Sequence, residues 1–272
     1  MTGHLDLLCA LDTRGQSCLR RQSFRAPMHL SKPHLDCGTL VVNVVNPTAG
    51  LFAGDCVSSQ VHVEPGANLL LTTPSASRVH RTRGGYAEVS QEFSVAAGGF
   101  LEIWPELFIP HGGACYRQTT ALRIEDEGEL LFFETLAPGR VAHGEVFAYE
   151  ALEWSMDLFV SGTLAARERY RLAPDSFSVA AMRAQFPNAY YASCFAVSRR
   201  LEKGSACWQK IHELHEKNAW VGCSRLAGGG GWVVKYLAAS SILLRRKLAE
   251  TRAILYEAMS RKTPGFRRVA GN

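Results

Sequence analysis

The sequence has no apolar run of about 18 residues, the length that a membrane-spanning helix needs. Its N-terminal segment lacks the basic region, apolar stretch and small-residue cleavage site of a secretory signal. Eight cysteines are present but none form a C-x-x-C pair, and scattered single cysteines are typical of reduced thiols in a chain without an export signal. We therefore expect a cytoplasmic protein without a disulfide framework.

Common catalytic motifs are absent as well. The chain contains no G-x-S-x-G, H-E-x-x-H, P-loop or G-x-G-x-x-G pattern, so hydrolase, zinc protease, nucleotide and dinucleotide sites lack their usual parts. Carboxylates near expected strand ends could still supply the acid and base of a β-helical polysaccharide-active enzyme. These are Glu102, Glu106, Asp126, Glu134 and Glu145. Since most Asp and Glu side chains are solvated, exposed strand-end charge is the simpler interpretation.

Positive charge is concentrated at one end of the chain. From Ser241 onward, eight basic and two acidic residues give a net charge of +6, whereas the whole chain carries +5. This basic end indicates an acidic partner surface or nucleic acid, or else a solvated helix whose cations complement its C-terminal dipole. A basic nucleic-acid-binding protein is therefore a second alternative, although Arg81, Arg83 and Tyr86 lie outside any RNP-type motif.

The middle of the chain repeats one unit four times: an alternating strand, a turn and a strongly apolar strand. The units comprise residues 57–63 with 67–71, 89–95 with 100–103, 120–124 with 129–133, and 152–158 with 163–166. Aligning Leu69, Leu101, Leu130 and Leu164 gives spacings of 32, 29 and 34 residues. The period-2 alternation and the uneven spacing favour stacked β-layers over helical repeats. Each unit alone buries too little apolar surface, so stacking supplies the core.

The C-terminal third predicts about two helices. Residues 205–217 have apolar positions at helical spacing, and residues 240–260 carry a longer apolar stripe. Between them, residues 220–226 and 232–237 predict a hairpin across four glycines. We therefore expect a single domain over residues 1–272 that is mainly β, an elongated β-helical or sandwich-like stack of strands.

The loop at residues 46–55, NPTAGLFAGD, precedes an apolar strand that ends in Thr72, Thr73 and Pro74. This arrangement resembles the urease accessory protein D family, UreD or UreH, whose members carry N-P-x-G-G-x-x-G-G-D before a strand ending in T-T-P. Ala49 and Ala53 replace the first glycine of each usual pair. The similarity covers nearly the whole chain, continuing through residues 101–117, Gly139 and Arg140, Gly144 and Glu145, residues 164–172 and residues 224–268.

The resemblance implies a non-catalytic chaperone that binds neither nucleic acid nor a membrane. Members of this family bridge urease apoenzyme to an F-type accessory protein and a G-type GTPase in a hetero-oligomer, so that nickel reaches the urease active site. It also implies no tightly bound cofactor, only nickel in transit along a water-filled route. The residues expected at partner surfaces are Asn46, Gly50, Gly54, Asp55, Thr73, Pro74, Arg81, Arg140 and Glu145. Turn chemistry is the other interpretation of these residues, and Asp55 either caps backbone N–H groups or faces a partner.

Two pairs of residues are weak candidates for nickel ligands. His212 and His215 would lie on one face of the helix expected at residues 205–217, and imidazole suits this metal. His111 and Cys115 form a looser pair. Neither pair has the dense spacing of a structural metal site, and both can be surface or packing residues.

Overall fold

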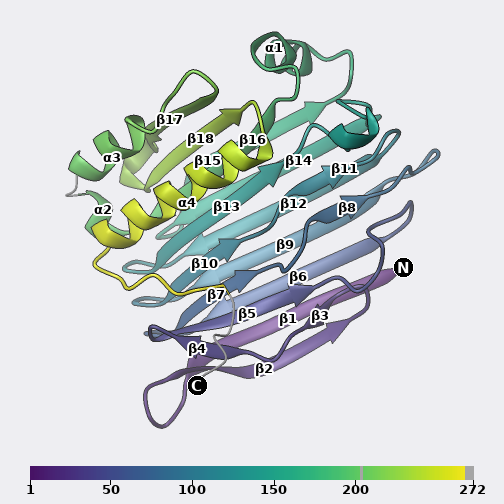
Figure 1. Cartoon of the computed structure of the whole chain (residues 1–272). Helices are drawn as coiled ribbons and strands as arrows, with labels where there is room; N and C mark the ends of the chain where they lie inside the picture. Colours follow the sequence, from purple (N-terminus) through teal and green to yellow (C-terminus); the bar gives the residue numbers. More distant parts are fainter. Residues whose placement is uncertain (203–204, 267–272) are drawn as a thin grey trace, which may run out of the picture.

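The computed structural model describes residues 1–202 and 205–266, which form two β-sheets stacked face to face (Figure 1). The seven-stranded sheet has the order β15-β14-β12-β9-β6-β1-β2. Its strands are β1 (Thr2–Leu11), β2 (Ser17–Arg25), β6 (Cys56–Val63), β9 (Ala87–Val95), β12 (Cys115–Ile124), β14 (Ala151–Val160) and β15 (Thr163–Leu172). The mainly β fold expected from the sequence is confirmed.

The eleven-stranded sheet has the order β17-β18-β16-β13-β10-β7-β5-β3, and β4, β8 and β11 attach beside this path. Its strands are β3 (His29–Leu30), β4 (His34–Asp36), β5 (Thr39–Val45), β7 (Asn68–Thr72), β8 (Ser77–Val79), β10 (Phe100–Trp104), β11 (Phe108–Pro110), β13 (Glu129–Leu136), β16 (Tyr190–Val197), β17 (Ala219–Arg225) and β18 (Trp232–Ala238).

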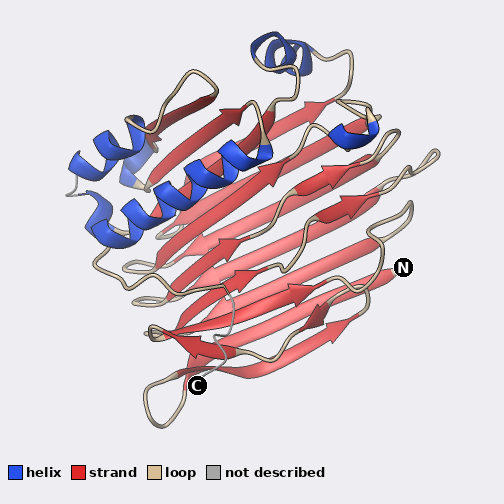
Figure 2. Cartoon of the chain, in the orientation of Figure 1, coloured by secondary structure: helices blue, strands red, loops and turns tan. Residues whose placement is uncertain are grey.

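Helices cover part of the outer face of the eleven-stranded sheet (Figure 2). The covering helices are α2 (Arg199–Glu202), α3 (Ser205–His212) and α4 (Ser241–Ala258). Outside this layer are α1 (Phe177–Gln185) and the 3-10 helices η1 (Val141–His143) and η2 (Ala227–Gly229). The hydroxyl of Ser240 caps α4 by accepting from the backbone N–H of Leu243 at 3.3 Å. Within the described ranges, every helix is too short or too polar to span a membrane.

Three of the four repeated units form successive parallel layers. Leu69 of β7 lies opposite Leu101 of β10, and Leu101 lies opposite Leu130 of β13, as the spacing of the leucines predicted. The first strand of each unit joins the seven-stranded sheet and the second joins the eleven-stranded sheet. The core lies between them, where inward side chains of both sheets meet.

The two kinds of strand differ because their outer faces differ. On β6, buried and exposed residues alternate, since one face of the seven-stranded sheet meets the core and the other meets water. On β13, almost every residue is buried, because this strand packs against the core on one side and against the helical layer on the other. The alternating and continuous apolar patterns of the sequence thus report which sheet each strand joins.

The fourth unit was predicted wrongly. Leu164 does not continue the leucine ladder, because β15 pairs antiparallel with β14 in the seven-stranded sheet and places Leu164 opposite Phe159. The vacant position beside β13 is filled by β16, which also runs antiparallel. Antiparallel strands therefore end the parallel stack in both sheets.

The C-terminal elements are largely as expected. The hairpin is confirmed, with β17 and β18 antiparallel, and α4 occupies most of residues 240–260. The helix expected at residues 205–217 ends earlier, at His212, because the chain then turns and Glu216 bridges to Ala219 at the start of β17. The short helices α1 and α2 were not predicted. None of the eight cysteines, all of which lie within the described residues, forms a disulfide.

Candidate functional site

Prolines interrupt the eleven-stranded sheet at one end. After β5, β7 and β10 the chain passes Pro47, Pro74 and Pro105, and pairing resumes only at Leu51, β8 and β11. Proline has no backbone N–H and cannot join the ladder. Side chains span the gap instead: the hydroxyl of Thr73 accepts from the N–H of Glu106 at 2.8 Å. The predicted partner residues Thr73 and Pro74 therefore lie at a break in the sheet.

A cavity of about 240 Å³ lies between the two sheets at this break. Exposed Ser75, Ser77 and Arg78 line one end of it, and the buried side chains of Gln118 and Trp154 line the other. The cavity thus leads from the surface into the space between the sheets.

Two carboxylates line the cavity, Glu106, which binds Arg245, and Glu134 of β13. Glu134 Oε1 accepts from Gln118 Nε2 at 2.6 Å and from Trp154 Nε1 at 3.2 Å. Burial raises the pKa of Glu134 from its ordinary 4.5 to about 7, and the charge of Glu168 adds to the rise. Its remaining accessible surface faces the cavity rather than the exterior. A proton acceptor with a pKa near neutrality therefore stands inside the molecule.

More polar side chains continue this network. Gln118 Nε2 donates to the hydroxyl of Thr120 at 3.2 Å, and that hydroxyl donates to Gln91 Oε1 at 3.1 Å. Tyr116 donates to Gln118 Oε1 at 2.7 Å. These residues come from the neighbouring strands β9 and β12, so a polar cluster spans two layers beside a cavity whose wall is otherwise mainly apolar.

The loops beyond the break stack in the same layers as the strands. Leu51 bridges to Val79, and Val79 lies opposite Pro110. The residues that follow each of these, Phe52, His80 and His111, consequently form a ladder. The rings of Phe52 and His80 stack at 4.5 Å, and the rings of His80 and His111 meet edge to face at 4.4 Å.

Arg140 and Glu145 close the next layer as an ion pair. Arg140 Nε and the backbone N–H of Gly112 each donate to Glu145 Oε2 at 2.8 Å. The hydrogen bond from Arg140 has the largest effect on this carboxylate, and together with the bond from Gly112 it lowers the pKa of Glu145 from 4.5 to about 2. Burial lowers the pKa of His111, and the positive charge of Arg140 lowers it further. The side chain of Arg81 lies over Gly113 and donates to the carbonyl of Gly112 at 3.4 Å.

The conformation of the loop at residues 46–55 rests on its own side chains. Asp55 is 6% exposed, and its carboxylate accepts from the N–H of Phe52 at 2.8 Å and binds the ammonium of Met1 at 2.7 Å. Asp55 therefore caps the turn, which is one of the two roles expected for it. Asn46 accepts from the N–H of Thr48 at 2.9 Å. Gly50 and Gly54 take positive φ, whereas Ala49 and Ala53 do not, so alanine costs nothing there.

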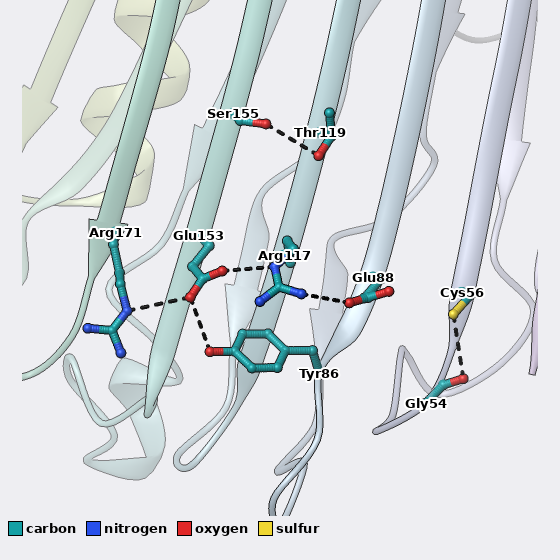
Figure 3. A network of polar contacts seen from close by, with 9 residues as sticks. All are labelled: Gly54, Cys56, Tyr86, Glu88, Arg117, Thr119, Glu153, Ser155 and Arg171. Carbon is teal, nitrogen blue, oxygen red and sulfur yellow. Dashed lines mark hydrogen bonds and ion pairs between the residues drawn. The ribbon is translucent and has the colours of Figure 1, made fainter.

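On the outer face of the seven-stranded sheet, charges neutralise one another (Figure 3). Arg117 binds Glu88 and Glu153, each at 2.8 Å, and Arg171 binds Glu153 at 3.5 Å. The hydroxyl of Tyr86 donates to Glu153 at 3.1 Å, and the guanidinium of Arg117 lies 4.4 Å from the centre of its ring. This face therefore presents little uncompensated charge.

The profile of the UreD urease accessory protein family matches residues 1–270. A protein of Opitutus terrae named urease accessory protein UreD is 41% identical over 264 residues, covering 95% of this chain and 96% of the relative. The chain belongs to the UreD family. Relatives with the same name in Actinomyces naeslundii and in a species of Arthrobacter are each 30% identical, over 87% and 95% of this chain and 87% and 92% of their own lengths. The family resemblance is confirmed, and with it a place in urease maturation and metallocentre assembly.

The structure brings together all nine residues expected at partner surfaces. Asn46, Gly50, Gly54, Asp55, Thr73, Pro74, Arg81, Arg140 and Glu145 all lie at the interrupted end of the eleven-stranded sheet or in the loops stacked beyond it. Their contacts are mainly those of turns and loop packing. Which of them meets a partner stays a prediction.

The candidate nickel ligands lie in two separate places. His212 ends α3 and His215 lies in the turn after it, so they do not share a helix face as expected. The ring of His215 stacks on Trp220 at 6.2 Å. His111 belongs to the ladder, while Cys115 is buried at the start of β12 and its N–H donates to Thr82. Across residues 1–202 and 205–266, no three His, Cys, Asp or Glu side chains form a group that could hold a metal.

Of the five carboxylates considered for a polysaccharide-active enzyme, Glu106 and Glu134 line the same cavity, and the other three do not. Four of them bind an arginine: Glu102 binds Arg252, Glu106 binds Arg245, Asp126 binds Arg199 and Glu145 binds Arg140. Glu134 belongs to the cavity network. Because Arg245 engages Glu106, the two carboxylates that share the cavity do not form a pair of free acid and base.

Sequence reasoning missed the roles of Gln91, Gln118 and Trp154. A signal was present, because Gln118 and Thr120 occupy inward positions of an alternating strand where apolar residues are expected. Gln91 lies directly opposite Thr120 on the neighbouring strand. Polar residues at matching inward positions of adjacent layers predict a polar site inside the sandwich.

Glu134 should make stability depend on pH. Because its pKa is higher in the folded protein than in the unfolded chain, its stabilising effect is complete below pH 4.5 and is lost as the pH rises through about 7. We expect the free energy of unfolding of the natural protein, relative to Glu134→Gln, to fall by about 3 kcal/mol between about pH 4 and pH 8. Urea denaturation of both proteins across this range measures the difference, and a constant difference would contradict the assignment.

Proposed function

We propose that this UreD-family chain is a non-catalytic scaffold in the cytoplasm, which bridges urease apoenzyme to an F-type accessory protein and a G-type GTPase. Family membership supports the scaffold role, since the similar proteins are named as urease accessory proteins. We further propose that nickel passes through this chain as cargo. The observation that carries this second part is a cluster of polar side chains, Gln91, Gln118 and Glu134, on the otherwise mainly apolar wall of the cavity between the sheets.

A route for nickel must offer ligands that hold the ion weakly enough to release it. The cavity offers the amide oxygens of Gln91 and Gln118 and the carboxylate of Glu134, whereas its second carboxylate, Glu106, is engaged by Arg245. Because the pKa of Glu134 is about 7, this carboxylate can lose its proton when a cation arrives and regain it when the cation leaves. One titrating carboxylate among neutral oxygens suits transit better than storage.

Glu134→Gln tests the route. The amide keeps an acceptor for Gln118 and Trp154 but cannot ionise, so we expect the nickel content and activity of urease made with this variant to fall about tenfold or more. Copurification of the variant with urease should be unchanged. Glu92→Gln is the matched control, because it removes a carboxylate from the exposed outer face of β9, where Glu92 binds Arg123.

The two parts of the proposal fail separately. Full nickel content with Glu134→Gln would contradict the route and leave the scaffold intact. If cells that lack this chain still produced fully nickel-loaded urease, or if the natural chain did not copurify with urease and the accessory proteins, the scaffold role itself would be wrong.

A further inference from the structure

Three arginines at the interrupted end of the sheet have no carboxylate partner. Arg78, Arg81 and Arg83 lie along the segment from β8 to the loop before β9, and all three are exposed. Within residues 1–202 and 205–266 none of them forms an ion pair, and Arg81 donates only to the carbonyl of Gly112. We call these three residues the arginine rim.

The rim differs from other arginine-rich parts of the surface. Most exposed arginines of the seven-stranded sheet bind carboxylates of neighbouring strands, as do Arg117, Arg123, Arg167, Arg169 and Arg171; Arg25 at the end of β2 is an isolated exception among the described residues. Of the acidic residues in the loops around the rim, Asp55 caps its own turn and Glu145 binds Arg140, while Glu150 forms no ion pair with the rim within the described residues. The charge of the rim is therefore uncompensated, and the end face has a positive potential.

An apolar anchor lies beside the rim. Phe52 is 47% exposed at the end of the ladder, where its ring stacks on His80. The backbone of Gly50 packs against Arg78, so the loop that carries Phe52 and the strand that carries the rim form one surface. Exposed aromatic rings next to arginines are the residue types that contribute most to protein interfaces.

We propose that the arginine rim and Phe52 form the docking surface for an acidic segment of a partner protein, one that carries an apolar or aromatic side chain. Complementary charge would steer the segment to the rim, and Phe52 would anchor it. The inference rests on the proposed scaffold function, because it names the surface that a partner uses and the chemistry of that partner.

The position of the rim links docking to the cavity. Arg78 lines the outer end of the cavity with Ser75 and Ser77. An uncompensated arginine at this point repels a divalent cation, because like charges separated by a few ångströms interact strongly near a protein surface. Carboxylates of a docked segment would reverse the local sign of charge and supply oxygen ligands at the entrance. The free chain then disfavours entry of the ion, whereas the complex favours it.

Nucleic acid is also an anion, but the structure favours a protein segment. Single strands bind through several aromatic rings on which bases stack. Tyr86, which follows the rim in the sequence, is not available for stacking, because its hydroxyl binds Glu153 and Arg117 covers its ring. Phe52 remains as the exposed ring beside the rim.

Binding of model ligands tests the surface directly. The probes are a fluorescein-labelled polyglutamate peptide with one central phenylalanine, the same peptide with glutamine in place of glutamate, and a short oligothymidine. We expect Arg78→Gln/Arg81→Gln/Arg83→Gln to weaken binding of the glutamate peptide about tenfold at low salt. The control Arg14→Gln/Arg183→Gln/Arg225→Gln changes the net charge equally at exposed positions elsewhere, and should bind within about twofold of the natural chain. Arg78→Gln/Arg83→Gln, which keeps the bond from Arg81 to Gly112, should weaken binding in the same direction.

The outcomes separate this inference from the proposed function. Equal weakening by the rim and control variants would show only non-specific charge attraction, and preferential binding of oligothymidine or of the glutamine peptide would overturn the choice of partner. The same variants are then tested for copurification with urease and the accessory proteins. If the natural chain copurifies and the rim variant does so equally well, the docking surface is wrong and the scaffold role stands. If the natural chain does not copurify, the scaffold role fails.

Discussion

Replacing Glu102 by glutamine is expected to lower the free energy of unfolding by about 3–5 kcal/mol, the cost of leaving a buried charge without its partner. Glu102 on β10 is completely buried. Arg252 of α4 donates to its two carboxylate oxygens at 2.6 and 2.8 Å, and the hydroxyl of Tyr256 donates at 2.6 Å. An amide at this position cannot compensate the buried guanidinium. Urea denaturation of the natural protein and the variant measures the loss.

Two further variants show whether the loss comes from the buried charge. Glu92→Gln breaks an exposed pair with Arg123 and should change stability by at most about 1 kcal/mol. Glu102→Leu combined with Arg252→Met removes both buried charges and should be clearly more stable than Glu102→Gln alone. If Glu102→Gln were no more harmful than Glu92→Gln, this ion pair would not hold α4 to the sheet.

The second large effect is expected at Gly139, in the loop between β13 and β14. Its φ is +137°, and an added Cβ would lie 2.3 Å from the backbone carbonyl oxygen of Glu145. Because backbone must move to admit a methyl group there, we expect Gly139→Ala to cost roughly 2–5 kcal/mol. The Arg140–Glu145 pair should be disturbed with it, since both residues belong to this loop.

Gly144 provides the control within the same loop. Its φ is +73°, and an added Cβ would meet no atom within 4 Å, so Gly144→Ala should cost only about 1 kcal/mol. Thermal and urea unfolding of the two variants measure the difference. Equal losses would mean that backbone conformation alone, rather than contact with the carbonyl oxygen of Glu145, decides the requirement for glycine.

The layers of the fold could be predicted because the sequence repeats their pattern. Leu69, Leu101 and Leu130 are opposite one another, since each occupies the same place in an alternating-then-apolar unit. The prediction for Leu164 was wrong, although the sequence of its unit looks similar. In the first three units four residues join the two strands, enough to pass from one sheet to the other, whereas only Ser161 and Gly162 join β14 to β15. A two-residue link makes a hairpin within one sheet.

The candidate site was predictable only in part. The glycine-rich loops marked the correct end of the molecule, because turns demand particular residues that can be seen in the sequence. The contacts that give the site its properties are not local. Glu134 meets Trp154 across the sandwich, and Glu102 meets Arg252 from 150 residues away. Such pairs depend on how sheets and helices pack, and periodicity along the chain does not report that.

The parallel layers also determine how the chain must fold during synthesis. Val57 pairs with Val89, 32 residues later. A strand of the parallel stack can therefore form these hydrogen bonds only after the distant segment that pairs with it has been synthesised. The hairpin of β1 and β2 closes one side of the stack early, but the growing side presents an unpaired parallel edge after every layer. That edge persists until the antiparallel strands β15 and β16 emerge from the ribosome. Nascent chains of this protein therefore expose an aggregation-prone strand edge for most of their translation. The edge is covered only when the C-terminal part of the sequence has been synthesised.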